Sequence, residues 1–269
     1  NSHQPVYGLR THIGFWRFLV LRHSVAHDQW MVNVVTAAEE RNVVQPLADL
    51  LMDNYPQVVS VVNNITSRKA GIAIGEYEIT LAGSPTLIDK INSFEFEISA
   101  NSFFQTNTRG ADKLYKTVKT YAGLTGEETV IDLYSGTGSI TIYLSDSAKE
   151  VIGIEIVESA VRDAEKNCRL NRVANCGFIH GDIKDCLSKI TTHADVMIID
   201  PPRSGMHKKV VKQVIDMAPG RIVYVSCNPA TMARDLALMK DRYMVLEVQP
   251  VDMFPHTYHI EAVAKLILK

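Results

Sequence analysis

The second part of the chain alternates short apolar runs with longer segments of helical periodicity. The segments between the runs include 159–171, 208–217 and 231–239, where apolar residues recur every three or four positions. Such alternation is typical of a mostly parallel, doubly wound sheet with helices on both faces. The predicted strands are 129–133, 150–155, 177–180, 196–200, 221–226, 243–250 and 262–268.

The first part of the chain has a different pattern. Branched and aromatic residues predict strands, and residues 43–52 have the spacing of an amphipathic helix. We therefore expect a small α/β domain over residues 1–93, followed by a larger α/β domain over residues 94–269 that starts with a helix capped by Thr108. The strands predicted in the first domain are 17–22, 30–35, 58–62 and 76–81.

Composition narrows the class of protein. The 269 residues are 46% hydrophobic and 22% charged, which is ordinary for a folded globular protein. The net charge of −2 excludes binding to nucleic acid through bulk basicity, so any such contact must use local patches. No apolar run has the length of a membrane span, so we expect no contact with a membrane. The first residue is Asn1, and we expect the chain to be part of a longer protein.

The four cysteines have a spacing that predicts neither a zinc site nor a disulfide framework. They are Cys168, Cys176, Cys186 and Cys227. We expect no metal in this chain, a reducing cytoplasmic location, and a structural role for the first three.

A glycine-rich segment, Asp132 to Gly138, follows the first strand of the larger domain. Ligands of open α/β sheets bind at such strand ends, and Gly136 lets a ligand approach the backbone. A dinucleotide fingerprint needs a third glycine, but Thr141 stands there. Glu155 ends the next strand and can hold ribose hydroxyls, and Asp182 follows the third and can reach an adenine amino group. This set predicts S-adenosylmethionine as the cofactor.

Three groups further along predict covalent chemistry. Asp200 ends the fourth strand and begins the segment Asp200-Pro201-Pro202-Arg203, and Cys227 follows the fifth strand within Ser226-Cys227-Asn228-Pro229. A thiolate that adds to carbon 6 of uracil makes carbon 5 nucleophilic, and cysteine is well suited to such covalent catalysis. Removal of the proton from carbon 5 then needs a base, for which Glu261 is the candidate. His256 and His259 remain alternatives to Glu261.

Five segments together resemble the RNA (uracil-5-)-methyltransferase family, whose members make 5-methyluridine in tRNA and rRNA. They are Phe103-Phe104-Gln105-Thr106-Asn107, Asp132 to Gly138, Asp200 to Gly205, Ser226 to Pro229, and His259 to Glu261.

The resemblance covers nearly the whole chain and implies a Rossmann-like class I methyltransferase fold that acts on RNA, with no obligate protein partner. It implies that Cys227 is the nucleophile and Glu261 the base, and that Phe103 or Phe104 stacks on the flipped base. It also implies that the cofactor site is lined by Gln105, Tyr134, Glu155, Asp182 and Asp200.

The sequence departs from the family pattern in two ways. Family members usually carry an N-terminal β-barrel that binds RNA, which we do not expect within these residues. Some hold an iron–sulfur cluster through four cysteines near that barrel, but no cysteine precedes Cys168, so we expect no cluster here.

An RNA cytosine-5 methyltransferase is the nearest alternative, although it would place a second cysteine in the loop 200–205, which has none. The other alternative is a non-catalytic RNA-binding module.

Overall fold

The structure, a computed structural model, describes residues 3–269, so Asn1 and Ser2 of the predicted first domain lie outside the described residues. The chain forms two compact units. One contains the residues up to Lys90 and Phe96–Ser102, and the other contains Ile91–Glu95 and Phe103–Lys269. Strands β5 (Thr86–Ile91) and β6 (Phe94–Ser99) form a two-stranded sheet that both units share. The predicted boundary at residues 93 and 94 falls in the turn between them and stays a prediction.

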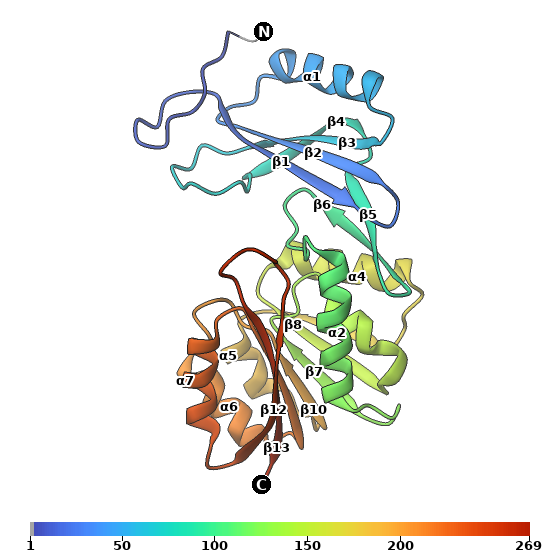
Figure 1. The fold of residues 1–269 in the computed structure, drawn as a ribbon, viewed down its shortest axis with the longest axis vertical. Helices are drawn as coiled ribbons and strands as arrows, with labels where there is room; N and C mark the ends of the chain where they lie inside the picture. Colours follow the sequence, from blue (N-terminus) through green and yellow to red (C-terminus); the bar gives the residue numbers. More distant parts are fainter. Residues whose placement is uncertain (1–2) are drawn as a thin grey trace. The chain divides into compact units, whose positions relative to one another are not determined.

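The first unit is built on a four-stranded sheet in the order β1-β2-β3-β4 (Figure 1). The helix α1 (Arg41–Asn54) packs its buried Val44 and Ala48 against the sheet residues Val32, Val34 and Val61. The sequence had predicted this helix and these strands but missed β5 and β6. The strands are β1 (Trp16–Ser24), β2 (Gln29–Thr36), β3 (Val58–Ile65) and β4 (Tyr77–Gly83).

The second unit is built on a seven-stranded sheet in the order β12-β13-β11-β10-β7-β8-β9. The five strands from β11 to β9 are parallel, and β13 runs antiparallel between β11 and β12. This confirms the predicted Rossmann-like, mostly parallel fold. The strands are β7 (Thr129–Leu133), β8 (Glu150–Glu155), β9 (Cys176–His180), β10 (Val196–Ile199), β11 (Arg221–Ser226), β12 (Tyr243–Val251) and β13 (Glu261–Leu268).

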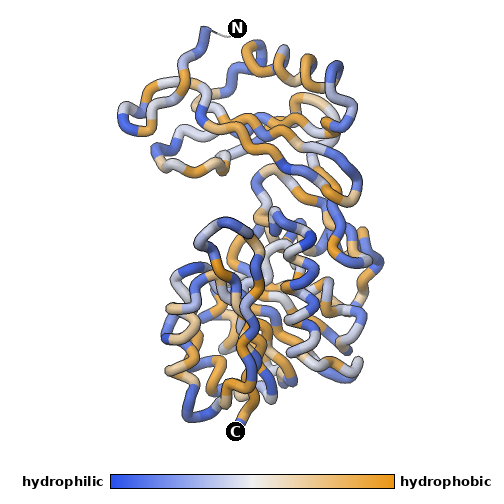
Figure 2. Tube along the Cα trace, viewed as in Figure 1, coloured by the Kyte–Doolittle hydropathy of each residue, from blue (hydrophilic) through white to orange (hydrophobic). Residues whose placement is uncertain are grey.

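Helices cover both faces of this sheet. Figure 1 shows α2 and α4 on one side and α5, α6 and α7 on the other. The central strands are therefore shielded on both faces, which explains why β10 is apolar and fully buried along its length. Figure 2 shows the same apolar interior as orange segments. The helices are α2 (Thr108–Ala122), α3 (Ser139–Leu144), α4 (Glu158–Leu170), α5 (Ile183–Cys186), α6 (Lys208–Met217) and α7 (Pro229–Met239).

The start of α2 corrects one prediction. The capping residue is Asn107, not Thr108, which is the first helical residue and is buried. The Asn107 side chain accepts a hydrogen bond from the backbone N–H of Gly110 at 3.0 Å. Its amide also donates to the backbone carbonyl of Met253 at 2.7 Å. Asparagine can do both at once because it carries an acceptor and a donor, so it ties the start of α2 to the loop after β12.

Candidate active site

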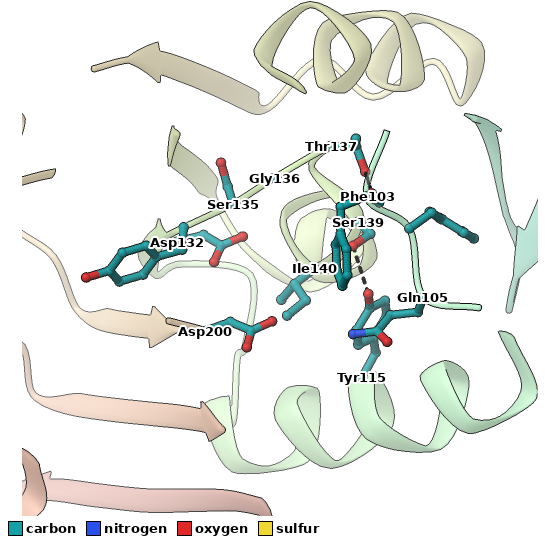
Figure 3. Close-up of a pocket in the computed structure, with 12 residues that line it drawn as sticks. Phe103, Gln105, Tyr115, Asp132, Ser135, Gly136, Thr137, Ser139, Ile140 and Asp200 are labelled. Carbon is teal, nitrogen blue, oxygen red and sulfur yellow. Dashed lines mark hydrogen bonds between the residues drawn. The ribbon is translucent and has the colours of Figure 1, made fainter. Parts of the chain in front are cut away.

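A pocket opens at the carboxyl ends of β7 and β10, where the order of the sheet reverses and ligands of such folds bind. It brings together four of the predicted site residues, Gln105, Tyr134, Gly136 and Asp200. Figure 3 shows the carboxyl groups of Asp132 and Asp200, from neighbouring strands, extending into the same space. The full lining is Phe103, Phe104, Gln105, Tyr115, Asp132, Tyr134, Ser135, Gly136, Thr137, Ser139, Ile140 and Asp200.

The glycine-rich loop after β7 bends sharply because three of its residues have positive φ. Tyr134, Gly136 and Gly138 have φ values of 64°, 54° and 77°. A Cβ added to Gly138 would lie 2.8 Å from Phe178 Cζ, so the loop needs glycine there for close packing. A Cβ added to Gly136 would meet no atom within 4 Å, so open space lies beside this residue.

Glu155, at the end of β8, holds this loop. Its carboxylate accepts from the backbone N–H of Gly136 at 3.0 Å and from that of Val157 at 2.8 Å. Glu155 is not among the residues that line the pocket, but it contacts one that is. The acid predicted to bind ribose thus lies directly behind the loop.

Asp132 is a buried acid at the base of the pocket, with an exposed fraction of 1%. One of its oxygens accepts from Thr141 Oγ1 at 2.6 Å, and the other has no hydrogen-bond partner. Burial raises the pKa of Asp132 to about 7, and the charges of Asp200 and Glu155 add to the rise. A buried carboxyl oxygen without a partner is costly, so it is available to a ligand that brings a donor.

Cys227 and Glu261 are brought together by the pairing of β11 with β13. Ser226 pairs with Ala262, so in this antiparallel register Cys227 comes next to Glu261. Burial and the charge of Glu261 raise the pKa of the Cys227 thiol. Burial and the charge of Asp200 raise the pKa of Glu261 to about 7. A carboxyl group with such a pKa can give or take a proton near neutral pH.

Asp200 connects the pocket with this pair. It lines the pocket, and its charge raises the pKa of both Glu261 and Cys227. Burial raises the pKa of Asp200 itself to about 6. The Arg203 guanidinium offsets part of this effect, because its positive charge lowers the pKa of Cys227 and of Glu261. A thiol, two acids and a cation therefore lie beside one pocket.

Hydrogen bonds between the residues that follow β11 and the segment 200–203 hold this arrangement together. The amide of Asn228 donates to the carbonyl of Arg203 at 3.1 Å, and Thr231 Oγ1 donates to the same carbonyl at 3.3 Å. Asn228 also caps α7, because its side chain accepts from the N–H of Ala230. The turn residues around Cys227 thus fix its loop against the loop that carries Arg203.

Asp182, the acid predicted to reach the adenine amino group, lies at the start of α5. Asp182 caps α5 by accepting from the N–H of Lys184, and it pairs with Lys184 Nζ at 2.8 Å. It lies outside the pocket lining. Burial raises the pKa of Tyr134 to about 12, and the charges of Asp235 and Asp182 add to the rise.

The two phenylalanines differ in exposure: Phe103 is 74% exposed and Phe104 only 6%. Of the two candidates for stacking on a base, Phe103 is the accessible one.

The two alternative bases lie on the loop before β13. His259 is partly buried, and its Nδ1 lies 2.8 Å from Arg203 NH2. His256 is exposed and has a positive φ of 67°. Glu261 comes next to Cys227 where β11 and β13 pair, whereas both histidines lie on the loop before this pairing begins. The geometry therefore favours Glu261 over either histidine as the group beside the thiol.

The sequence had not assigned a site role to Asp132, Tyr115 or Ser139, all of which line the pocket. The hydroxyls of Tyr115 and Ser139 are hydrogen bonded to each other at 2.8 Å (Figure 3). For Asp132 a signal existed, because an acid inside the apolar run 129–133 of a central parallel strand is rare without a function. For Tyr115 there was none, since an aromatic residue on the apolar face of a helix is ordinary core.

The pocket fits the predicted cofactor. Asp132 Oδ1 and Ser135 Oγ are buried polar atoms that lack a partner in the protein, and S-adenosylmethionine has both donors and acceptors to offer. Open space beside Gly136 leaves room for a ligand against the backbone. Within residues 3–269, no group of three or more His, Cys, Asp or Glu side chains is placed to hold a metal ion. Nor does any helix in this range have the length and apolar character needed to cross a membrane.

The chain is similar in sequence to proteins described as RNA methyltransferases. The chain is 44% identical over 265 residues to an uncharacterized RNA methyltransferase of Chlorobaculum tepidum, a match that covers 96% of this chain and 55% of that protein. It is 42% identical over 268 residues to an uncharacterized RNA methyltransferase of Geobacter sulfurreducens, covering 98% of this chain and 54% of the other. Over nearly its whole length, the chain is thus similar to RNA methyltransferases. It spans about half the length of the curated relatives that it matches.

Two family models and one solved structure add detail to this similarity. The model for tRNA (uracil-5-)-methyltransferase matches residues 182–269, and that for RNA cap guanine-N2 methyltransferase matches residues 127–219. The similar solved structure is that of a tRNA (uracil-54, C5)-methyltransferase of Pyrococcus abyssi in complex with S-adenosyl-L-homocysteine. It is 33% identical with a TM-score of 0.81, and the match covers 96% of this chain and 61% of that one. Cys227 and Glu261 both lie within the uracil-5 match.

Proposed function

We propose that this chain is the catalytic part of an S-adenosylmethionine-dependent enzyme that methylates carbon 5 of a uridine in tRNA or rRNA. The observation that carries the proposal is the position of Cys227 next to Glu261, directly beyond the last pair of β11 and β13, Ser226 and Ala262, and beside a pocket lined by Asp200. A methyl donor alone does not need a thiol. Carbon 5 of a pyrimidine does, because it becomes nucleophilic only after addition at carbon 6.

The cofactor would be held by residues of the glycine-rich loop and its neighbours. Gly136 allows close approach, and the Glu155 carboxylate, which accepts from the N–H of Gly136, would hold the ribose hydroxyls. Asp132 Oδ1 is a free acceptor for the ammonium group of the methionine part. When bound there, the cofactor supplies an electrophilic methyl group. Gln105, Tyr134, Asp182 and Asp200 complete the set of side chains proposed for the site.

The first task of the protein is to make carbon 5 nucleophilic. Cys227 loses its proton to solvent and its sulfur forms a bond to carbon 6, while the electrons of the 5,6 double bond move toward carbon 5 and oxygen 4. The raised pKa of Cys227 favours the protonated thiol in the absence of a substrate. The Arg203 guanidinium counteracts the nearby carboxylates and stabilises the thiolate. Carbon 5 would then accept the methyl group, with S-adenosylhomocysteine as the leaving group.

The second task is to release the product. The Glu261 carboxylate takes the remaining proton from carbon 5, the 5,6 double bond re-forms, and the bond between carbon 6 and sulfur breaks. The thiolate of Cys227 is thereby regenerated. With a pKa raised to about 7, Glu261 is a stronger base than an ordinary carboxylate and still substantially ionised at neutral pH. Phe103, which is exposed beside the pocket, would stack on the flipped uracil.

Neither alternative is favoured by the structure. The loop 200–205, which in a cytosine-5 enzyme would carry a second cysteine, contains Arg203 beside Cys227 instead. A module that only binds RNA would not need the Cys227–Glu261 pair.

The experiment is a comparison of RNA from cells with the intact gene and from cells in which it is disrupted. Nucleoside mass spectrometry and mapping of tRNA and rRNA should show one 5-methyluridine lost on disruption. The intact gene should restore it, and a gene with Cys227→Ala should not. Loss of a 5-methylcytidine instead would overturn the uridine assignment, and loss of neither would overturn the proposed activity.

A further inference from the structure

Tyr258 has a position that the proposed reaction does not explain. Its side chain is 85% exposed, above every other exposed large hydrophobic side chain among residues 3–269. It lies on the loop that joins β12 to β13, dark red in Figure 1, three residues before Glu261. A tyrosine ring in water forgoes the free energy of burying its apolar area, so a ring held outward beside a reactive group invites a partner.

The loop that carries Tyr258 is anchored at both ends. Met253 is buried, and its carbonyl accepts from the Asn107 side chain at 2.7 Å. At the other end, Arg203 contacts His259 at 2.8 Å. Between them, the N–H and the hydroxyl of Thr257 both donate to the carbonyl of Phe254, at 3.1 and 2.7 Å. The Tyr258 ring is therefore presented by an ordered loop, which keeps the entropic cost of binding low.

The surroundings of the ring indicate the chemistry of its partner. Tyr258 contacts His259 with ring centroids 4.3 Å apart and ring planes inclined by 40°, and its side chain stays 85% exposed. His259 in turn contacts Arg203, whose charge affects both Cys227 and Glu261. An aromatic face next to a guanidinium group suits a nucleotide, because the base stacks on the ring while the cation attracts the phosphate.

We propose that Tyr258 stacks on an RNA base that neighbours the target nucleotide in sequence, and so helps to hold the strand while the target base enters the site. This inference rests on the proposed function, since it takes RNA as the substrate. It assigns a different task from that of Phe103, which lines the pocket with Asp200. Tyr258 is a binding residue with no part in the bond-making steps.

The test uses the full-length protein and a set of short RNAs built on the mapped target sequence. Each RNA carries 5-fluorouridine at the target and 2-aminopurine at one flanking position. The 5-fluorouridine traps the adduct because a base cannot remove the fluorine that replaces the hydrogen on carbon 5. Stacking on an aromatic ring quenches 2-aminopurine. We expect the wild type to quench one flanking position at least about twofold, and Tyr258→Leu to restore its emission.

The same variants separate stacking from a merely structural role. Tyr258→Leu should raise KM for RNA about 5- to 150-fold, the range expected from loss of one base–aromatic stack, with little change in kcat. Tyr258→Phe and Tyr258→Trp should restore both KM and quenching because each keeps a ring. Tyr55→Leu, which removes an exposed tyrosine from α1's end, is the matched control and should change neither value.

Two outcomes would overturn the inference: no flanking position quenched by the wild type, or quenching that persists in Tyr258→Leu. Either result with normal adduct formation leaves the proposed reaction standing. Absence of any adduct at 5-fluorouridine contradicts the proposed reaction instead, and the quenching comparison still decides whether Tyr258 contacts RNA.

Discussion

At the scale of single residues, Glu261 and Cys227 should fail in different ways when they are replaced. Cys227→Ala removes the atom that bonds to carbon 6, so we expect neither turnover nor covalent RNA. Glu261→Gln keeps the shape but not the base, so the enzyme should attack, methylate and then stall with RNA attached. Loss of a positioned base typically slows a reaction about 10²–10⁴-fold. A denaturing gel with labelled RNA and cofactor would show the adduct as a slow band.

The control for this prediction is the double variant, in which the slow band should vanish. Glu97→Gln serves as a matched neutralisation of a glutamate in the other compact unit and should leave turnover unchanged. If Glu261→Gln turns over at the wild-type rate without an adduct, then the base is another residue. His259 would be the next to replace, because it contacts Arg203 directly.

The pH dependence of the rate follows from the raised pKa of Glu261. A base acts in its ionised form, so when proton removal limits turnover the rate should rise with pH through about 7 and then level off. Asp200→Asn removes a negative charge that raises this pKa. The midpoint of the rise should therefore move to lower pH, even though the variant is slower overall. A midpoint that stays the same in Asp200→Asn would mean that Glu261 is not the titrating group.

At the scale of elements, the glycine-rich loop offers a matched pair of substitutions. Both Gly136→Ala and Gly138→Ala place a side chain at positive φ, which costs about 1–2 kcal/mol of stability. The added Cβ meets no atom at Gly136 but lies 2.8 Å from Phe178 and 3.0 Å from Ala164 at Gly138. Overpacking should cost Gly138→Ala about 1–3 kcal/mol more. Denaturant unfolding measures both values.

The same pair should respond differently to the cofactor. At Gly136 the new methyl group stands in open space beside the pocket, so it should weaken S-adenosylmethionine binding more than it weakens the fold. Calorimetric titration of the two variants against the wild type checks this. Equal cofactor affinity of Gly136→Ala and the wild type would remove this residue from the cofactor site.

Most elements could be predicted from the sequence because their apolar spacing is a local signal. Residues 196–199 and 221–226 are apolar runs that form buried parallel strands, and Cys227 after the second run follows from that pattern. The hairpin of β5 and β6 was missed because Asp89, Glu95 and Glu97 interrupt its apolar positions. Its charged residues lie within an alternation that is clear only once the pairing is known.

Contacts between distant segments could not be predicted in the same way. The approach of Arg203 to His259 joins residues 56 positions apart, and nothing in either segment alone indicates it. The register that sets Cys227 beside Glu261 depends on β13 running antiparallel between two other strands. Likewise, Asn107 outcompeted Thr108 as the cap of α2 because it also reaches Met253, which is far along the chain.

At the scale of the whole molecule, three acids near the pocket make stability depend on pH. Burial raises the pKa of Asp132 and of Glu261 to about 7 and that of Asp200 to about 6. The folded state therefore binds more protons than the unfolded state between about pH 4 and pH 7. For a raised carboxyl pKa, the stabilisation is complete below the unfolded value and is lost as pH rises through the folded value. Stability should thus fall from pH 5 to pH 8.

Asp132→Asn tests this directly, since the amide can still accept from Thr141 Oγ1 and carries no charge. The free energy of unfolding, measured in denaturant at pH 5 and pH 8, should change less between the two conditions in this variant than in the wild type. Asp53→Asn, at an exposed position of α1, removes the same charge and should keep the wild-type difference. An unchanged pH dependence in Asp132→Asn would show that this acid ionises at its ordinary pKa in the folded protein. The unpartnered oxygen of Asp132 would then already be charged before any cofactor ammonium reaches it.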